Sequence, residues 1–206
     1  MLLMMLYEVL VVVIPVVVAY AIWVSRCARK NTRPEVSLTL IVLFSFYLSL
    51  AFLITGSGTI FDFLRFQPDL PSTQVYFAFF ADRAASTQNV LNAVLFIPLG
   101  FLVSWISKSA RAIGPVALYG IGLSLLIEIS QMLNYRVTDI DDIIMNLLGA
   151  LLGYGIYLCI ALLRKETLFK TEQKLQVHQV LMFIIGIAFL SRFFFFNPYL
   201  LMGIIR

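Results

Sequence analysis

Long apolar runs recur along this chain and constrain its fold more than any other feature. A helix rises ~1.5 Å per residue, so about 20 apolar residues are needed to cross ~30 Å of hydrocarbon. Six stretches have this length and character: residues 6–24, 36–55, 89–106, 112–132, 143–163 and 178–197. We therefore predict an all-α integral membrane protein, a compact bundle of about six transmembrane helices that forms a single domain over residues 1–206.

The composition supports lipid as the solvent for much of the surface. The chain is 61% hydrophobic and 13% charged, whereas a soluble domain carries about 25% charged residues. No basic residue precedes Arg26, which is unlike the basic start of a cleavable signal peptide, so we interpret the first run as a transmembrane helix. The net charge of +4 comes from short basic runs between apolar stretches, a pattern that indicates topology and not nucleic-acid binding.

The basic residues predict the orientation. Ten of the 15 Lys and Arg residues follow the first, third and fifth runs: Arg26, Arg29, Lys30, Arg33, Lys108, Arg111, Arg164, Lys165, Lys170 and Lys174. The positive-inside rule assigns these loops to the cytoplasm. Both termini, residue Glu8 and the loops 56–88 and 133–142 are then expected to be extracytoplasmic. The aromatic-rich 56–88 loop is expected to lie on the membrane surface.

Polar and small residues share one face in each of three runs when residues are placed at ~100° steps. These residues are Asn89, Asn92, Ala93, Phe96, Gly100 and Ser104, then Ala117, Gly120, Ser124, Glu128, Gln131 and Tyr135, and then Asp142, Asn146, Gly149 and Gly153. Small residues let helix backbones approach closely. We predict that the three faces meet, with their polar ends forming one site that opens outward.

Each of these groups also has a structural interpretation. The asparagines could only join helices through hydrogen bonds, and Asp139, Asp141 or Asp142 could only cap a helix. An intramembrane carboxylate such as Glu128 is a functional candidate by default. Arg192 is expected at a similar depth, where it could pair with Glu128 or extend to lipid headgroups.

No cofactor motif is evident. The single histidine, His178, is remote from the carboxylates, and no Cys/His cluster or phosphate-binding glycine loop occurs. The spacing of Asp139, Asp141 and Asp142 is weak evidence for a hard cation, so we predict neither a metal nor another cofactor. Cys27 and Cys159 are expected to be free thiols.

Three segments together resemble the VanZ-like family, which is named for a teicoplanin-resistance protein. They are NVLNAVLFIPLGFL at 89–102, LLIEISQ at 125–131 and YRVTDIDDIIMNLLGALLGY at 135–154. The resemblance implies a multi-pass protein of the bacterial plasma membrane that is associated with resistance to teicoplanin-type glycopeptides. It implies no agreed biochemical activity.

We expect a non-enzymatic site that binds membrane lipids, a lipid-linked cell-wall precursor or a lipoglycopeptide. The candidate residues are Asn89, Asn92, Glu128, Gln131, Arg136, Asp139, Asp142, Asn146 and Arg192. Arg83 and Arg136 could bind phosphate or carboxylate, and the asparagines could bind sugar or peptide amides. Alternatives are an enzyme acting on a lipid-linked phosphate, with Glu128 as the base, and a lipid or small-molecule transporter.

Overall fold

The computed structural model describes residues 2–31, 36–66, 75–76, 83–106, 112–134, 138–165 and 175–200. Its long helices are α1 (Leu2–Arg29), α2 (Leu38–Thr55), α4 (Arg83–Ile106), α5 (Ile113–Gln131), α6 (Ile140–Leu163) and α7 (Leu175–Phe195). Short elements are α3 (Ile60–Phe66), the 3₁₀ helix η3 (Met132–Asn134) and the two-residue strands β1 (Val75–Tyr76) and β2 (Thr138–Asp139). Each long helix coincides with one predicted run.

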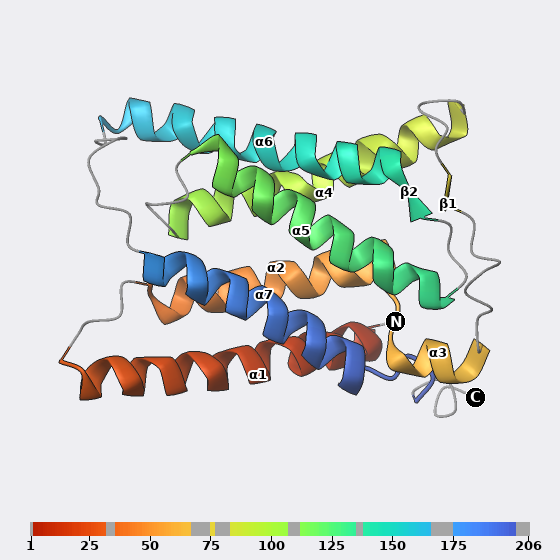
Figure 1. Ribbon diagram of the computed structural model, residues 1–206, viewed down its shortest axis with the longest axis horizontal. Helices are drawn as coiled ribbons and strands as arrows, with labels where there is room; N and C mark the ends of the chain where they lie inside the picture. The colour runs from red at the N-terminus through yellow and green to blue at the C-terminus, as the bar shows by residue number, and fades with distance from the viewer. Residues whose placement is uncertain are drawn as a thin grey trace. The chain divides into compact units, whose positions relative to one another are not determined.

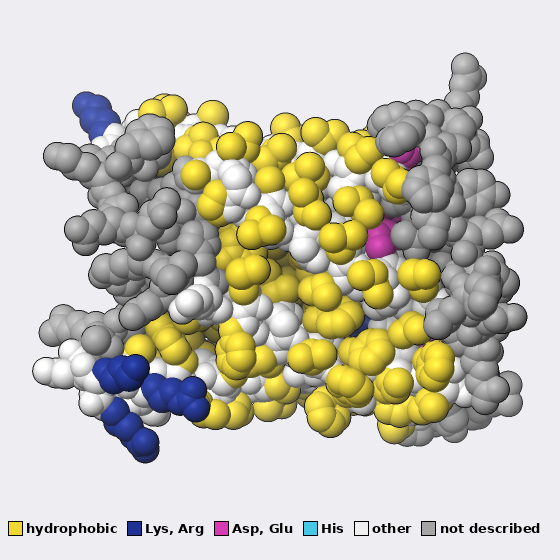
Figure 2. All heavy atoms as spheres, viewed as in Figure 1, with side chains coloured by type: hydrophobic (Ala, Val, Ile, Leu, Met, Phe, Trp, Pro, Cys, Tyr) yellow, Lys and Arg dark blue, Asp and Glu magenta, His cyan; other side chains and the backbone are white. Residues whose placement is uncertain are grey.

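The predicted all-α membrane architecture is confirmed. Five helices of the described chain are long and apolar enough to cross a membrane, and α7 contributes a shorter apolar segment, Gln179–Phe195. Hydrophobic side chains cover most of the visible face, with Lys and Arg side chains at the end of α1 (Figure 2). Such a surface suits lipid as its surroundings.

The chain divides into two compact units, and the division passes through α5 and α7. The first unit comprises Met1–Gln74, Ile127–Val137 and Phe183–Arg206. The second comprises Val75–Leu126 and Thr138–Met182. The element labels of Figure 1 allow each unit to be followed along the chain.

In the first unit α1 packs along α2 (Figure 1). The buried residues of α1 recur every fourth position, at Glu8, Val12 and Val16, so one face of the helix is turned inward. The Tyr7 hydroxyl donates a hydrogen bond to the Phe195 carbonyl over 2.7 Å. The start of α1 therefore lies beside the end of α7.

The turn between α2 and α3 is defined by its own sequence. Gly56 has φ 63° and ψ 41°, the left-handed conformation that glycine adopts at low cost. The Gly56 and Ser57 amides donate to Leu53 and Phe52, which ends α2 in a Schellman motif. Asp62 then accepts hydrogen bonds from the Thr59 amide and hydroxyl, at 2.7 and 2.8 Å, and caps α3.

Beyond the end of α7, Tyr199 attaches the chain to α3. Its hydroxyl donates to Asp62 over 2.5 Å, and the Arg65 guanidinium lies 4.4 Å from the centre of its ring. Burial and the adjacent Asp62 carboxylate raise the pKa of Tyr199 to about 12. The tyrosine therefore stays a hydrogen-bond donor across the physiological pH range.

In the second unit α4 and α6 lie side by side (Figure 1). A Cβ atom added at Gly149 or Gly153 would overlap the main-chain carbonyls of Ala93 or Ile97, and one added at Gly100 would overlap that of Ala150. The glycines thus allow the two backbones to touch, which agrees with the predicted meeting of their faces. The strands β1 and β2 form a two-residue parallel pair at one end of this unit.

Candidate functional site

The polar ends of α4 and α6 meet in the second unit. The Asn92 side-chain amide donates a hydrogen bond to the Asp142 carboxylate over 2.5 Å. Asn92 is 7% exposed, and it directly precedes Ala93, whose main-chain carbonyl lies against Gly149 of α6. A hydrogen bond to a charged acceptor is among the stronger ones in proteins. The predicted meeting of these two polar faces is therefore confirmed.

A second hydrogen bond brings α5 to the same layer. The Asn146 side-chain amide donates to the Ser124 hydroxyl over 2.8 Å, and both residues are buried. Asn146 follows Asp142 by one helical turn, so the two contacts of α6 are stacked along one face. Further along that face, Gly120 packs against Ala150. Helices α4, α5 and α6 thus contribute their predicted faces to one buried polar layer.

This layer contains polar atoms without a protein partner. Within the described part of the chain, neither the side-chain amide nitrogen of Asn89 nor the side-chain oxygen of Asn146 has a hydrogen-bond partner. The two residues are 3% and 2% exposed. A buried polar atom that lacks a partner costs about 1–3 kcal/mol. Water or a ligand with hydroxyl or amide groups would supply the absent bonds.

Gln131, another predicted site residue, has a structural contact in the first unit. Its side-chain amide donates to the Thr55 carbonyl over 2.7 Å. Asn134 donates to the Gly56 carbonyl, and the Gly58 amide donates to the Ser130 hydroxyl. The end of α5 and η3 therefore satisfy the backbone of the turn between α2 and α3.

Arg192 completes the contacts of this turn. Its Nη1 donates to the Ser57 carbonyl over 2.6 Å, and its Nε forms a 2.6 Å ion pair with Glu8. Of the two alternatives raised for Arg192, the pairing with Glu128 is wrong, because its acidic partner is Glu8. The alternative, extension to lipid headgroups, is also wrong, since Arg192 is only 4% exposed. Two charges in an apolar interior are favourable only when paired and hydrogen-bonded.

Glu8 was not predicted as a site residue. It was grouped with the acidic residues of the outer side, yet it is completely buried. The signal was available in the sequence, because Glu8 is the one residue of the first apolar run that is charged at neutral pH. It also shares its helix face with Val12 and Val16.

The remaining candidates stay predictions. Glu128 is 2% exposed and belongs to the first unit, whereas Asp142 and Asn146 belong to the second. Arg136 lies outside the described residues. For Asp139 only the backbone is described, paired with Tyr76 in the short sheet. The two cysteines are free thiols, as expected.

A comparison with known proteins matches the part of the chain that contains α4, α5 and α6. The family model VanZ/LLP1 matches residues 16–164. This range includes the polar layer of α4, α5 and α6 and excludes both Glu8 and Arg192. No curated protein and no solved structure matches the chain.

Proposed function

This chain is a member of the VanZ/LLP1 family, and we propose that it binds the headgroup of an amphiphile in the outer leaflet of the bacterial plasma membrane. The binding site would be the buried polar layer of α4, α5 and α6. The observation that carries the proposal is the pair of unpartnered polar atoms, the Asn89 nitrogen and the Asn146 oxygen, within that layer.

The chemistry of the layer favours a headgroup rich in amides and hydroxyls. Asparagine side chains both donate and accept, which matches peptide and sugar groups. Asn89 precedes Asn92 by three residues, and Asn146 follows Asp142 by four, so each unpartnered atom belongs to a residue one turn from the hydrogen bond that joins α4 to α6. An occupant would therefore contact groups whose positions are already fixed by helix packing.

The ligand classes that fit are a lipid-linked cell-wall precursor and an acylated glycopeptide of the teicoplanin type. Both combine an amide-rich or sugar-rich headgroup with a lipid tail that can remain in the bilayer. Arg83 and Arg136 flank these segments in sequence, and their guanidinium groups would bind phosphate or carboxylate. Sequestering the antibiotic or protecting the precursor would each produce glycopeptide tolerance.

The test is a direct binding measurement on the purified full chain in lipid nanodiscs. The probes are teicoplanin, the same glycopeptide without its acyl chain, and a lipid-linked wall precursor. We expect Asn89→Leu and Asn146→Leu to weaken binding of the acylated probe at least tenfold, equivalent to ~1.4 kcal/mol. Gln179→Leu is the matched control, because it removes an exposed amide from α7.

Melting temperatures separate binding from folding. Asn89→Leu removes a buried nitrogen that lacks a partner, so this variant should melt at or above the wild-type temperature. Asn146→Leu also removes the hydrogen bond to Ser124, so this variant should stay folded but melt below the wild-type temperature. Unchanged dissociation constants in both folded asparagine variants would exclude the polar layer as the binding site.

A further inference from the structure

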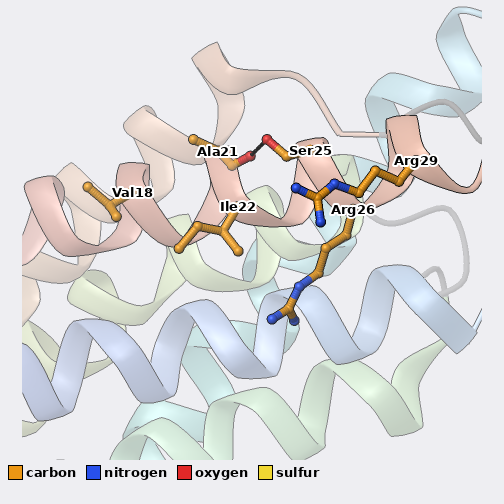
Figure 3. A pocket seen from close by; sticks show the side chains of 6 residues that line it. All are labelled: Val18, Ala21, Ile22, Ser25, Arg26 and Arg29. Atoms are coloured by element: carbon orange, nitrogen blue, oxygen red, sulfur yellow. Dashed lines mark hydrogen bonds between the residues drawn. The ribbon is translucent and has the colours of Figure 1, made fainter.

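A hollow lies along the C-terminal half of α1. It is lined by Val18, Ala21, Ile22, Ser25, Arg26 and Arg29 (Figure 3). All six side chains are exposed. The view shows Arg29 running back along the helix toward Ser25, while Arg26 extends outward on the side of Ile22. The two guanidinium groups therefore adjoin an apolar surface of the same helix.

Helical geometry places the charged and the apolar lining residues at opposite ends of the hollow. At ~100° per residue, Val18, Ile22 and Arg29 fall within about 40° of one another. At ~1.5 Å per residue, Arg26 is about 12 Å along the axis from Val18. The charged groups are consequently at one end of the hollow and the apolar groups at the other.

The apolar part continues as a ridge along α1. Leu6, Leu10, Ile14, Val18 and Ile22 follow at four-residue steps and are 45–55% exposed. Only 17% of the most apolar window of α1 is buried, the lowest share among the five candidate spans. Helix-to-helix contacts in membranes favour small residues, whereas this ridge consists of Leu, Ile and Val. Its surface suits an acyl chain better than a second helix.

We propose that this hollow binds an anionic phospholipid, with its phosphate between Arg26 and Arg29 and an acyl chain along Ile22 and Val18. Arginine is suited to the phosphate because its planar guanidinium donates two parallel hydrogen bonds. A zwitterionic lipid would bring its own cation close to the arginines and would bind less well. The site is independent of the polar layer of α4, α5 and α6.

Tryptophan fluorescence provides a local test. The chain has two tryptophans, so Trp105→Phe leaves Trp23, which lies on α1 between the lining residues Ile22 and Ser25 in sequence. Phosphatidylcholine with brominated chains quenches Trp23, and unlabelled lipids compete for the adjacent positions. Two arginines at a membrane surface should make phosphatidylglycerol roughly tenfold more effective than phosphatidylcholine.

Matched variants assign this preference to the hollow. Arg26→Gln with Arg29→Gln should abolish it, whereas Arg164→Gln, which removes an exposed arginine after α6, should retain it. Equal competition by the two lipids in the parent chain would overturn the proposal, as would a preference that survives the double substitution. If Arg164→Gln lost the phosphatidylglycerol preference equally, the preference would come from the general positive charge of the surface. If inorganic phosphate displaced the lipid, the hollow would be a site for the free anion. Either result would also overturn it.

Discussion

At the scale of single residues, the contact between Glu8 and Arg192 shows how the first unit accommodates charge. Each residue alone would leave an ion in an apolar interior at a cost of several kcal/mol. Together they form a 2.6 Å ion pair, and Arg192 also donates to the Ser57 and Gly58 carbonyls. The pair joins α1 to α7 across nearly the whole sequence. Arg192 therefore stabilises both an interhelical contact and a turn.

Removing one member of the Glu8–Arg192 pair should cost more stability per residue removed than removing both members together. We expect Glu8→Leu or Arg192→Leu to lower the free energy of unfolding by about 3–5 kcal/mol, because the remaining charge is buried and unpaired. The Arg192 variant should be the less stable, since two turn carbonyls also lose their donor. The double variant should recover part of the loss in a double-mutant cycle measured by unfolding in detergent. Strictly additive losses would contradict an energetically coupled pair.

The sequence was sufficient to predict some contacts of the candidate site, but not all of them. It predicted the shared faces that bring Asn92 to Asp142 and Asn146 to Ser124, because a helical period fixes which residues align. It could not predict that Gln131 binds the Thr55 carbonyl, since a partner 76 residues away depends on tertiary packing. The same limit explains why Glu8 was not considered as the partner of Arg192.

At the scale of elements, the association of α4 with α6 is the most predictable contact. Gly149 and Gly153 have the spacing of a close helix contact, but the sequence left open whether the third or the fourth run was the partner. The structure shows α4 at both positions. The short helix α3 was not predicted, although Thr59 and Asp62 have the spacing of an N-terminal cap. Its aromatic surroundings indicated a surface loop instead.

The glycine contacts give a matched set of substitutions within one helix. Gly149→Ala and Gly153→Ala should each destabilise the protein by about 1–3 kcal/mol, because the added carbon overlaps backbone that cannot rotate away. Gly155→Ala meets open space in the same helix and should be neutral or stabilising by up to ~1 kcal/mol. Melting temperatures in detergent measure the difference. Equal behaviour of all three variants would mean that the contact contributes little stability.

At the scale of the whole molecule, the predicted orientation has both termini outside the cytoplasm. Single cysteines at Asp69 and Thr138, introduced after Cys27→Ser and Cys159→Ser, should react with an impermeant thiol reagent in intact cells. Lys30→Cys is the control for the opposite side, and it should react only after the cells are permeabilised. The reverse pattern of labelling would invert the topology and would assign the polar layer to the other leaflet.

The central claim is that the polar layer binds a ligand and is not only a packing contact. Asp142→Asn is the sharpest substitution, because an amide oxygen can still accept the hydrogen bond from Asn92 while the negative charge is lost.

The decisive measurement is the dissociation constant of the acylated glycopeptide for Asp142→Asn, taken together with its melting temperature. We predict binding at least tenfold weaker, or ~1.4 kcal/mol, a melting temperature close to that of the wild type, and a parallel loss of glycopeptide tolerance in cells. Wild-type affinity and tolerance in a folded Asp142→Asn protein would contradict the account.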